Sequence, residues 1–379
     1  MTIGILGGGQ LGYMLALAGY PLGMHFRFLD PSPQTPVGRV APRVTAAYSD
    51  KEALEKFAHG LALVTYEFEN VPVDAARLLQ KHVPVYPPPE ALEVSQDRLN
   101  EKNLFQKLGV ATTEFASADS REDLDAAVRK IGLPAVLKTR RMGYDGKGQW
   151  VLRSPEEIAK IRSDFPEGQL ILEKFVPFER ELSILAVRGR AGETSFYPLV
   201  ENHHHGGILR LSLAPAPQLD SSLRKTAEDA ARRILDELRY VGVLAIEFFE
   251  RGGKLLANEM APRVHNSGHW TIEGAVTSQF ENHLRAVAGL PLGSTAPLGH
   301  SAMLNLIGEL PEPGEVLAVA DAHLHIYGKA LRPGRKVGHV TLRGATPEQL
   351  SARLAELPAF FHRPEFALEA ALAKSAKSI

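Results

Sequence analysis

A run of glycines near the start of the chain limits the type of fold that can follow it. Residues 3–6 are apolar, and Gly-Gly-Gly-Gln-Leu-Gly comes directly after them at 7–12. A strand that passes through a Gly-x-Gly-x-x-Gly turn into a helix opens a βαβ unit. Further apolar runs at 25–29 and 61–65, with helical stretches between them, predict a parallel sheet over residues 1–90.

The residues alone leave the ligand of this first turn open. Backbone N–H groups at the start of a helix attract anions, and Asp30 ends the next strand about where a ribose-binding acid would lie. The turn is therefore compatible with a dinucleotide such as NAD, with a different anionic ligand, or with a tight connection that binds nothing.

A second glycine-rich segment, at 138–149, is the sharper signal. Strands are predicted on both sides of it, at 135–139 and 149–152, so it is not a Walker loop, which would lead into a helix. Its glycines give a flexible backbone and its cations give positive charge, which favours a loop that closes over phosphates. A solvated basic hairpin is the alternative. The cations are Lys138, Arg140, Arg141 and Lys147.

Two further segments are candidates for holding a nucleoside. Glu-Lys-Phe-Val at 173–176 ends a predicted strand and could hold an adenine ring by backbone hydrogen bonds. Glu181 follows on the next strand and could accept hydrogen bonds from ribose hydroxyls. Taken singly, each is also compatible with a purely structural role.

Two glutamates on a predicted hairpin give a candidate metal site. Glu247 lies in the apolar run 243–249 and Glu259 ends the run 254–259, with Arg-Gly-Gly at 251–253 as the turn. Two carboxylates held close together repel each other unless a cation lies between them. Mg²⁺ prefers oxygen ligands and keeps phosphate oxygens in its shell, so the pair predicts a Mg·ATP site. Two glutamates on a solvent-facing edge are the alternative.

Composition excludes several other classes of protein. The 379 residues include no cysteine, which rules out disulfides, thiolate metal sites and cysteine nucleophiles and fits the cytoplasm. The formal net charge is -1, so no broad positive field favours nucleic acid or an anionic membrane. No apolar run approaches the ~18 residues of a membrane span, and the N-terminus predicts a strand rather than a signal peptide. The length predicts two or three domains.

Together the motifs resemble the 5-(carboxyamino)imidazole ribonucleotide synthase family of the ATP-grasp superfamily. The resemblance runs from about residue 3 to residue 345 and includes Asp-Arg-Leu at 97–99 and Gly-Tyr-Asp-Gly-Lys-Gly-Gln at 143–149. Its most specific motifs are His-Asn-Ser-Gly-His-Trp at 265–270 and Arg-Pro-Gly-Arg-Lys-Val-Gly-His at 332–339.

This resemblance implies an α/β and α+β fold in three parts. They are a Rossmann-like, biotin-carboxylase-like N-terminal domain at 1–95, a small ATP-grasp lid at 96–180 and a C-terminal ATP-grasp domain at 181–379. The last of these would end in a β-rich segment that begins at about 297.

The resemblance also implies an ATP-dependent carbon–nitrogen ligase of purine biosynthesis. Bicarbonate would attack ATP to give carboxyphosphate, and the exocyclic amine of 5-aminoimidazole ribonucleotide would then be carboxylated. The implied cofactors are ATP and Mg²⁺, with Mn²⁺ as a substitute. The implied protein is a cytoplasmic homodimer that binds neither nucleic acid nor membranes.

By the same resemblance, site residues fall into four groups. The residues implied for the nucleotide are Arg98, Lys138, Gly143, Tyr144, Asp145, Gly146, Lys147, Gly148, Gln149, Glu173, Lys174, Phe175, Val176, Glu181, His204, Asn258 and Glu259. Those implied for the ribonucleotide are Gln10, Leu11, Glu67, Glu69, Tyr144, Arg263, His265, Asn266, Ser267, Lys329, Arg332 and Arg335. The implied catalytic residues are Lys138, Asp145, Arg263 and Lys329, and the implied metal ligands are Glu247 and Glu259.

Two details qualify these assignments. Many ATP-grasp enzymes carry Asn two residues after the second metal glutamate, whereas this chain has Ala261, so Asn258 is expected to contribute instead. The triplet His-His-His at 203–205 cannot converge on one ion, because neighbouring side chains on a strand point to opposite faces. Only His204 is expected to point inward.

Rival functions remain at this point. One is an NAD(P)-dependent oxidoreductase built on the first glycine turn. Others are a sister ATP-grasp ligase, of the formate-dependent transformylase or biotin carboxylase type, and an ATP-binding regulatory module without turnover.

Overall fold

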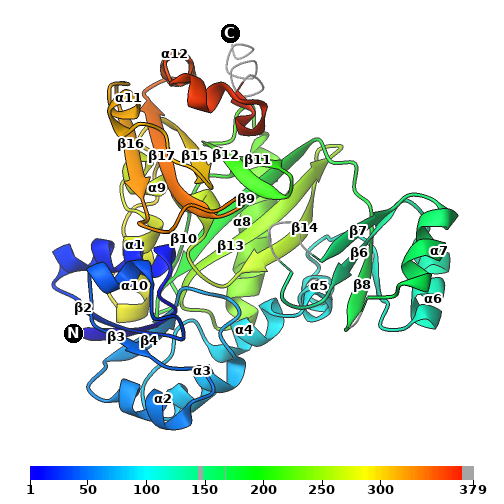
Figure 1. Cartoon of the computed structure of the whole chain (residues 1–379), viewed down its shortest axis with the longest axis horizontal. Coiled ribbons are helices and arrows are strands. Elements are labelled where there is room, and N and C mark those ends of the chain that lie inside the picture. Colours follow the sequence, from blue (N-terminus) through cyan, green and yellow to red (C-terminus); the bar gives the residue numbers. More distant parts are fainter. Residues whose placement is uncertain (144–147, 167, 369–379) are drawn as a thin grey trace.

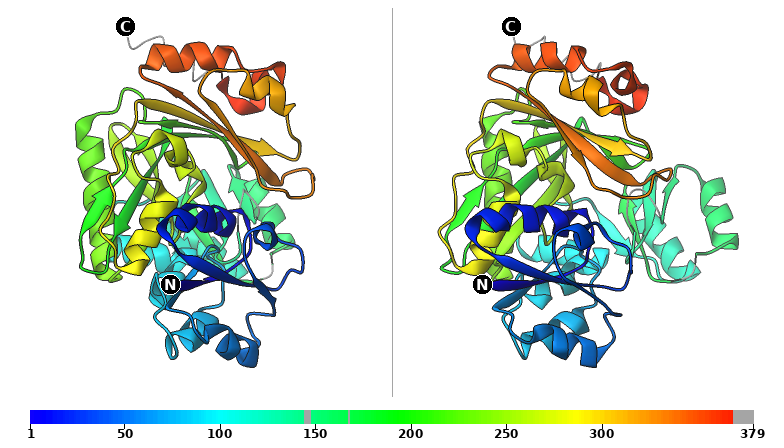
Figure 2. Two further views of the ribbon diagram at one scale, coloured as in Figure 1. Left: turned by 90° about the vertical axis from the view of Figure 1, so that its left-hand side faces the viewer. Right: turned by 60° about the vertical axis from the view of Figure 1, so that its left-hand side comes forward.

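Three β-sheets with helices packed on them make up the molecule (Figure 1). The structure is a computed structural model, and it describes residues 1–143, 148–166 and 168–368. The N-terminal sheet lies below the end of the large sheet, whereas the smaller middle sheet projects from the opposite side (Figures 1 and 2).

The N-terminal part is the predicted parallel sheet. Its elements are β1 (Thr2–Leu6), α1 (Gln10–Gly19), β2 (His25–Asp30), β3 (Arg43–Thr45), α2 (Lys51–Ala58), β4 (Leu63–Tyr66), α3 (Val73–Gln80) and α4 (Pro89–Ser95). The strand order is β3-β2-β1-β4, and all pairs are parallel, which confirms the prediction. Ile3 and Ile5 enter one apolar cluster and Leu6 another, so β1 is covered on both faces.

The middle part forms a small sheet with a core of its own. It comprises β5 (Phe115–Ser117), α6 (Arg121–Ile131), β6 (Ala135–Thr139), β7 (Gln149–Leu152), α7 (Pro155–Ser163) and β8 (Leu170–Lys174). The antiparallel order is β5-β8-β6-β7, and α6 packs beside β5 and β8. Strands lie on both sides of the second glycine-rich segment, as predicted.

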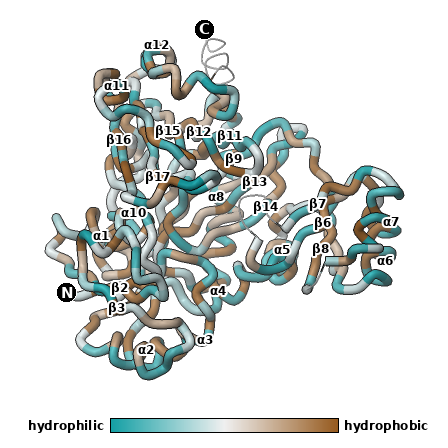
Figure 3. Tube along the Cα trace, viewed as in Figure 1, coloured by the Kyte–Doolittle hydropathy of each residue, from teal (hydrophilic) through white to brown (hydrophobic). Residues whose placement is uncertain are grey.

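The large sheet is antiparallel throughout and has nine strands. Its strands are β9 (Arg180–Arg188), β10 (Thr194–Phe196), β11 (Val200–His205), β12 (Ile208–Ala214), β13 (Gly242–Arg251), β14 (Lys254–Ala261), β15 (His300–Ile307), β16 (Ala322–Ile326) and β17 (Lys336–Gly344). The order is β14-β13-β9-β11-β12-β15-β17-β16, with β10 paired to β9. Hydrophobic residues follow these strands, whereas hydrophilic residues dominate outer helices such as α7 (Figure 3). The associated helices are α5 (Arg98–Lys107), α8 (Ser221–Glu237), η3 (Asn266–Gly268), α9 (Thr271–Gly274), α10 (Gln279–Ala288), α11 (Pro313–Leu317) and α12 (Pro347–Ala355).

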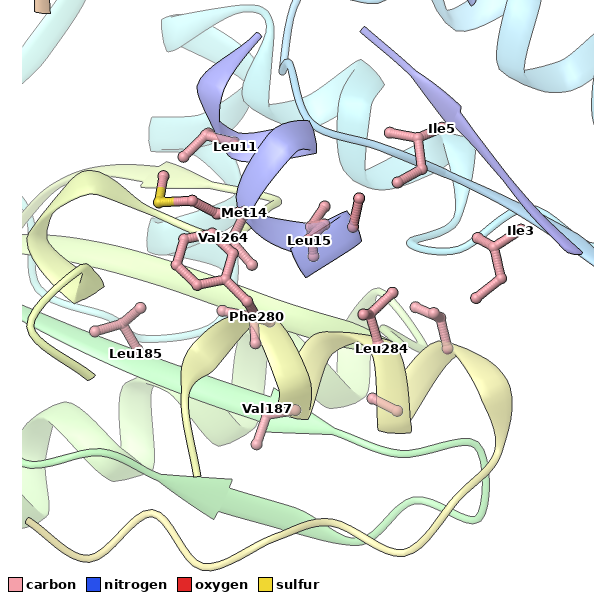
Figure 4. Close-up of a cluster of buried hydrophobic side chains, with 14 of the residues drawn as sticks. Ile3, Ile5, Leu11, Met14, Leu15, Leu185, Val187, Val264, Phe280 and Leu284 are labelled. Atoms are coloured by element: carbon pink, nitrogen blue, oxygen red, sulfur yellow. The ribbon is translucent and has the colours of Figure 1, made fainter. Parts of the chain in front are cut away.

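One apolar cluster joins the N-terminal sheet to the large sheet. Met14 of α1 and Phe280 and Leu284 of α10 lie in it together with residues of β1 and β9 (Figure 4). Gly19 allows the close approach of the two helices, because a Cβ there would lie 2.9 Å from a Leu284 methyl carbon. The two parts thus share one apolar interior.

The predicted domain ranges can be set beside these sheets. All strands of the first sheet lie within 1–95, those of the small sheet lie within 96–180, and β9 begins at Arg180. The β-rich end from about 297 adds β15, β17 and β16 to the large sheet rather than forming a sheet apart. The exact boundaries stay a prediction.

Candidate active site

The acidic pair lies on the predicted hairpin. In the antiparallel register of β13 and β14, Glu247 is directly opposite Glu259, and the register shifts by a bulge after Glu247. Directly opposed residues of antiparallel strands project to the same face of the sheet. The two carboxylates therefore share one side of the hairpin.

Arg98 gives the two carboxyl groups different pKa values. Its Nη1 donates to Glu259 Oε2 at 2.7 Å. Burial would raise the pKa of Glu259, but the nearby Arg98 outweighs it and holds that pKa at about 2. Burial, and next the negative charge of Glu259, raise the pKa of Glu247 to about 7. Glu247 is thus the more readily protonated of the two acids.

These two acids fit a divalent cation whose other ligands are phosphate oxygens and water rather than side chains. Within the described residues there is no group of three or more side chains suited to hold a metal. Mg²⁺ commonly takes one or two carboxylates and completes its shell with phosphate oxygens and water. A cation beside Glu247 would relieve the repulsion that raises its pKa.

A buried ion-pair cluster adjoins the acids. Lys138 Nζ lies 2.9 Å from Glu173 Oε2, and Lys102 Nζ lies 3.6 Å from the same oxygen. Burial would raise the pKa of Glu173, but the two lysines lower it to about 2. Glu173 is therefore ionised, and its second oxygen, Oε1, is buried without a hydrogen-bond partner among the described residues.

Glu101 and Lys102 are two site residues that sequence reasoning missed. Lys102 is 1% exposed and donates to Thr112 Oγ1 at 2.9 Å and to the Ala257 carbonyl at 3.1 Å. Glu101 accepts from the Met260 N–H at 2.7 Å, and burial, with the charge of Glu259, raises its pKa to about 8. Their only sequence signal was adjacency to Arg98 on one helix.

The residues expected around adenine and ribose lie beside this cluster. His204 Nδ1 is 3.0 Å from Glu181 Oε2, and this carboxylate outweighs burial and raises the pKa of His204. The three histidines diverge, because His203 faces Glu201 and His205 is exposed. The N–H groups of Lys174 and Phe175 already donate to the carbonyls of Glu114 and Pro134. Val176 is buried at the end of this segment.

Two of the four cations near the second glycine-rich segment serve the fold. Arg140 donates to both oxygens of Asp97, at 3.0 and 2.8 Å, and pairs with Asp119. Arg141 donates to Gln96 Oε1 at 2.9 Å. Gly143 precedes the gap in the described residues, and Gly148 and Gln149 follow it, Gly148 with φ +70°. Tyr144, Asp145, Gly146 and Lys147 lie outside the described residues.

The first glycine turn is filled by the protein's own carboxylates. Glu67 accepts from the N–H groups of Gly9 at 2.6 Å and Gly12 at 2.9 Å, and Asp30 accepts from Gly8 at 2.7 Å. A Cβ at Gly9 would lie 2.6 Å from Glu67 Oε1, so the glycine is needed for this contact. A pyrophosphate would have to displace two carboxylates, and the NAD interpretation of the turn is therefore wrong.

Polar side chains from the first and the large sheet meet beside this turn. Arg263 pairs with Glu69 and outweighs the effect of burial, so the pKa of Glu69 is lowered. His265 Nε2 lies 3.5 Å from Glu247 Oε1, and burial, with Arg263 and Lys336, lowers the pKa of His265 to about 3. Oδ1 of Asn258 and Nδ2 of Asn266 are buried and without partners among the described residues. Ser267 is fully buried.

The loop after β16 brings further cations to the same place. Lys329 donates to Gln10 Oε1 at the start of α1. Arg335 donates to the Ala330 carbonyl at 3.4 Å, and Arg332 is exposed. Leu11, in contrast, is 7% exposed and belongs to the apolar core, so its side chain is directed away from the polar cluster.

Comparison with known proteins gives the same order of parts along the chain. Residues 1–96 match the ribonucleotide synthetase preATP-grasp domain, 103–280 the ATP-grasp domain and 301–353 the phosphoribosylaminoimidazole carboxylase C-terminal domain. The N5-carboxyaminoimidazole ribonucleotide synthase of Pseudomonas aeruginosa is 57% identical over 359 residues, which cover 95% of this chain and 99% of the relative. The chain belongs to the N5-carboxyaminoimidazole ribonucleotide synthase family.

Solved structures of N5-carboxyaminoimidazole ribonucleotide synthases agree with this membership. The Thermus thermophilus enzyme is 64% identical, with a TM-score of 0.90 and coverage of 93% of this chain and 97% of that one. The Aspergillus clavatus enzyme, solved with ADP and 5-aminoimidazole ribonucleotide, is 28% identical, with a TM-score of 0.86 and coverage of 98% of both chains. The predicted ATP-grasp architecture with its Rossmann-like N-terminal domain is confirmed.

Membership in the N5-carboxyaminoimidazole ribonucleotide synthase family also decides against one of the alternative functions. The oxidoreductase built on the first glycine turn is excluded by the family and by the filled turn. No helix in the ranges that the structure describes is long and apolar enough to cross a membrane.

Proposed function

We propose that this protein uses ATP and bicarbonate to carboxylate the exocyclic amine of 5-aminoimidazole ribonucleotide. The product is N5-carboxyaminoimidazole ribonucleotide, an intermediate of purine biosynthesis. One observation carries the proposal: Glu247 and Glu259 are directly opposed, and Glu259 is paired with Arg98. Beside them lie Arg263, His265 and Lys329 from loops of the large sheet, where Arg263 and Lys329 contact Glu69 and Gln10 of the N-terminal part. The first group suits a metal-bound triphosphate and the second suits an anionic ribonucleotide.

The first step is phosphoryl transfer to bicarbonate. A bicarbonate oxygen attacks the γ-phosphorus of ATP, ADP leaves, and carboxyphosphate is formed. Such transfer depends on positioning and charge neutralisation rather than on covalent help. Lys138 and Arg98 supply positive charge, and both are now held by carboxylates that the nucleotide's phosphates would compete with.

The second step forms the carbon–nitrogen bond. The exocyclic amine attacks the carbon of carboxyphosphate or of the CO₂ that it releases, phosphate leaves, and the amine gives up a proton. Lys329 is the candidate acceptor of this proton, because partial burial lowers its pKa to about 8. Arg263, held by Glu69, stays charged and binds an anionic oxygen.

Mg²⁺ is the metal that the two acids would hold, with Mn²⁺ as a substitute. When bound, it neutralises charge on the β- and γ-phosphates. Glu259 is already ionised beside Arg98, and Glu247 would lose its proton on meeting the cation. A homodimer and a cytoplasmic location are part of the same proposal and are supported by family membership alone.

Release of ADP in a coupled assay, with each substrate omitted in turn, tests the function. We expect full ADP release only when ATP, bicarbonate and the aminoimidazole ribonucleotide are all present. Turnover that needs formate or biotin instead would place the protein with a sister ligase, and ATP binding without turnover would make it a regulatory module. A Lys138→Ala variant should lose turnover, whereas Lys56→Ala, at an exposed surface pair, should not.

A further inference from the structure

A line of four buried polar side chains crosses the large sheet and ends at His265. Ser212 Oγ on β12 lies 2.8 Å from Asn202 Oδ1 on β11, and Asn202 Nδ2 lies 2.9 Å from Ser183 Oγ on β9. Ser183 Oγ lies 2.8 Å from Ser267 Oγ, which lies 2.9 Å from His265 Nδ1. The four are at most 4% exposed. Buried polar groups are hydrogen-bonded in folded proteins, and these four satisfy one another.

The direction of every hydrogen bond in this line follows from one fixed donor. The backbone N–H of Ser267 points at His265 Nδ1, 3.4 Å away, because that ring nitrogen caps η3. A backbone N–H only donates, so Nδ1 has to be an acceptor. The Ser267 hydroxyl, which has a single proton, then also donates to Nδ1.

Donors and acceptors can be assigned in the same way for the other hydrogen bonds of the line. With its proton used, Ser267 accepts from Ser183, and Ser183 in turn accepts from the amide Nδ2 of Asn202. This leaves Asn202 Oδ1 to accept from the Ser212 hydroxyl. All links agree with one direction, from Ser212 towards His265.

The Ser267 N–H and the line together therefore indicate which ring nitrogen of a neutral His265 carries the proton. Because Nδ1 is an acceptor, the proton lies on Nε2, on the side of the ring that approaches Glu247 at 3.5 Å. Gln279 fixes the backbone of the same residue, since its side-chain oxygen accepts from the His265 N–H at 2.8 Å and its Nε2 donates to the His265 carbonyl at 2.7 Å. Ring position and tautomer are thus both set from inside the protein.

We infer that Ser267, Ser183, Asn202 and Ser212 are positioning residues that hold His265 as a hydrogen-bond donor to an anionic oxygen in the active site. The inference rests on the proposed function for the identity of that oxygen, which belongs either to bicarbonate or to the transferred phosphoryl group. His265 in this tautomer cannot accept the amine proton at Nε2. The line thus separates the donor role of His265 from the proton acceptor of the second step.

A nitrogen NMR spectrum of protein labelled with ¹⁵N-histidine tests the tautomer without any turnover. The resonances of His265 are identified by their absence in a His265→Gln variant. We expect a protonated Nε2 and an unprotonated Nδ1 in the native protein. A proton on Nδ1 would overturn the inference, whether or not the protein has the proposed activity.

Two substitutions test the line itself. Ser267→Ala removes the hydroxyl that donates to Nδ1, and we expect a mixture of tautomers. Asn202→Asp acts from a distance, because a carboxylate accepts from both serines, and we expect part of the population to shift to Nδ1–H. Ser301→Ala, which removes an equally buried hydroxyl on β15, should leave the His265 spectrum unchanged. An unchanged tautomer in both line variants would contradict the positioning role.

Kinetics then identify the oxygen. Ser267→Ala should lower kcat/KM about tenfold, as is typical when a partner that orients a site histidine is removed. A rise confined to the KM of bicarbonate assigns the oxygen to bicarbonate, and a fall in kcat at unchanged KM assigns it to the transferred phosphoryl group. Native kinetics for Ser267→Ala would overturn the donor role. His265→Gln, which keeps an amide donor near the Nε2 position, should retain more activity than His265→Asn.

Discussion

Burial and neighbouring charges bring the pKa of Lys329 close to neutral pH. Burial lowers its pKa to about 8, Glu67 opposes this shift, and Arg335 and Lys336 add to it. Below that pH the side chain is an ammonium group that donates to Gln10, and above it the group is a neutral amine. The same residue can therefore bind an anion at lower pH and accept a proton at higher pH.

At the residue scale, we expect binding of the ribonucleotide to weaken as the pH rises through about 8. Loss of the positive charge on Lys329 removes one charge-assisted contact, which corresponds to roughly a tenfold rise in KM. Steady-state kinetics between pH 7 and 9 would measure it. A Lys329→Arg variant stays charged and should lose this dependence, and an identical profile in that variant would contradict the assignment.

Glu259→Gln should reduce ADP release by at least roughly a hundredfold, because a neutral amide replaces the ionised carboxylate proposed to hold the metal. The shape of the side chain is kept, so we expect the circular dichroism spectrum to be unchanged. Glu237→Gln, at a surface pair with Lys107, is the matched control and should have native turnover. Full activity of Glu259→Gln at ordinary Mg²⁺ concentrations would exclude Glu259 as a ligand.

Features that depend on neighbouring residues could be predicted from the sequence, whereas contacts between residues far apart in the chain could not. The glycine turn, the hairpin with its two acids and the parallel sheet each follow from a few neighbouring residues. The carboxylate that fills the turn does not, because Glu67 lies 55 residues from Gly12. Lys102 was missed for the same reason, since it donates to a carbonyl 155 residues away.

At the element scale, α5 links the small sheet to the large one through one side of the helix. Arg98, Glu101 and Lys102 are spaced i, i+3 and i+4, so their side chains share a face. Arg98 and Glu101 reach β14, and Lys102 reaches both β14 and Glu173 on β8. Asp97 caps the helix by accepting from the Leu99 N–H and also binds Arg140.

Lys102→Met should therefore destabilise the protein by about 3 kcal/mol, because it removes one of the two lysines that balance the buried charge of Glu173. Urea unfolding monitored by fluorescence would measure the change. Lys107→Met, on the same helix but exposed, should change the free energy of unfolding by less than about 1 kcal/mol. Equal effects of the two substitutions would contradict a special role for Lys102.

At the scale of the whole molecule, the ribonucleotide side of the site depends on the core shared by α1 and α10. Gln10 begins α1, and the packing of this helix against α10, with Phe280 and Leu284 in the shared core, places it relative to the large sheet (Figure 4). The position of a substrate contact is thus determined by apolar packing that the substrate never touches.

Leu284→Ala should lower the free energy of unfolding by about 2–5 kcal/mol and also raise the KM of the ribonucleotide, because α1 loses part of its support. Leu124→Ala, in the separate core of the small sheet, should cost a similar amount of stability. It should leave the KM of the ribonucleotide unchanged. A rise in both variants would point to general loosening instead of a specific link.

The shared core has a consequence for how the protein is made. Gln10 and Lys329 are 319 positions apart, so a nascent chain leaves the ribosome with one half of this contact long before the other exists. Until Phe280 and Leu284 have emerged, the part of α1 that packs on α10 has no cover, although the N-terminal sheet can already pair. The nascent chain should consequently expose an apolar helix surface, to which chaperones can bind, for most of its synthesis.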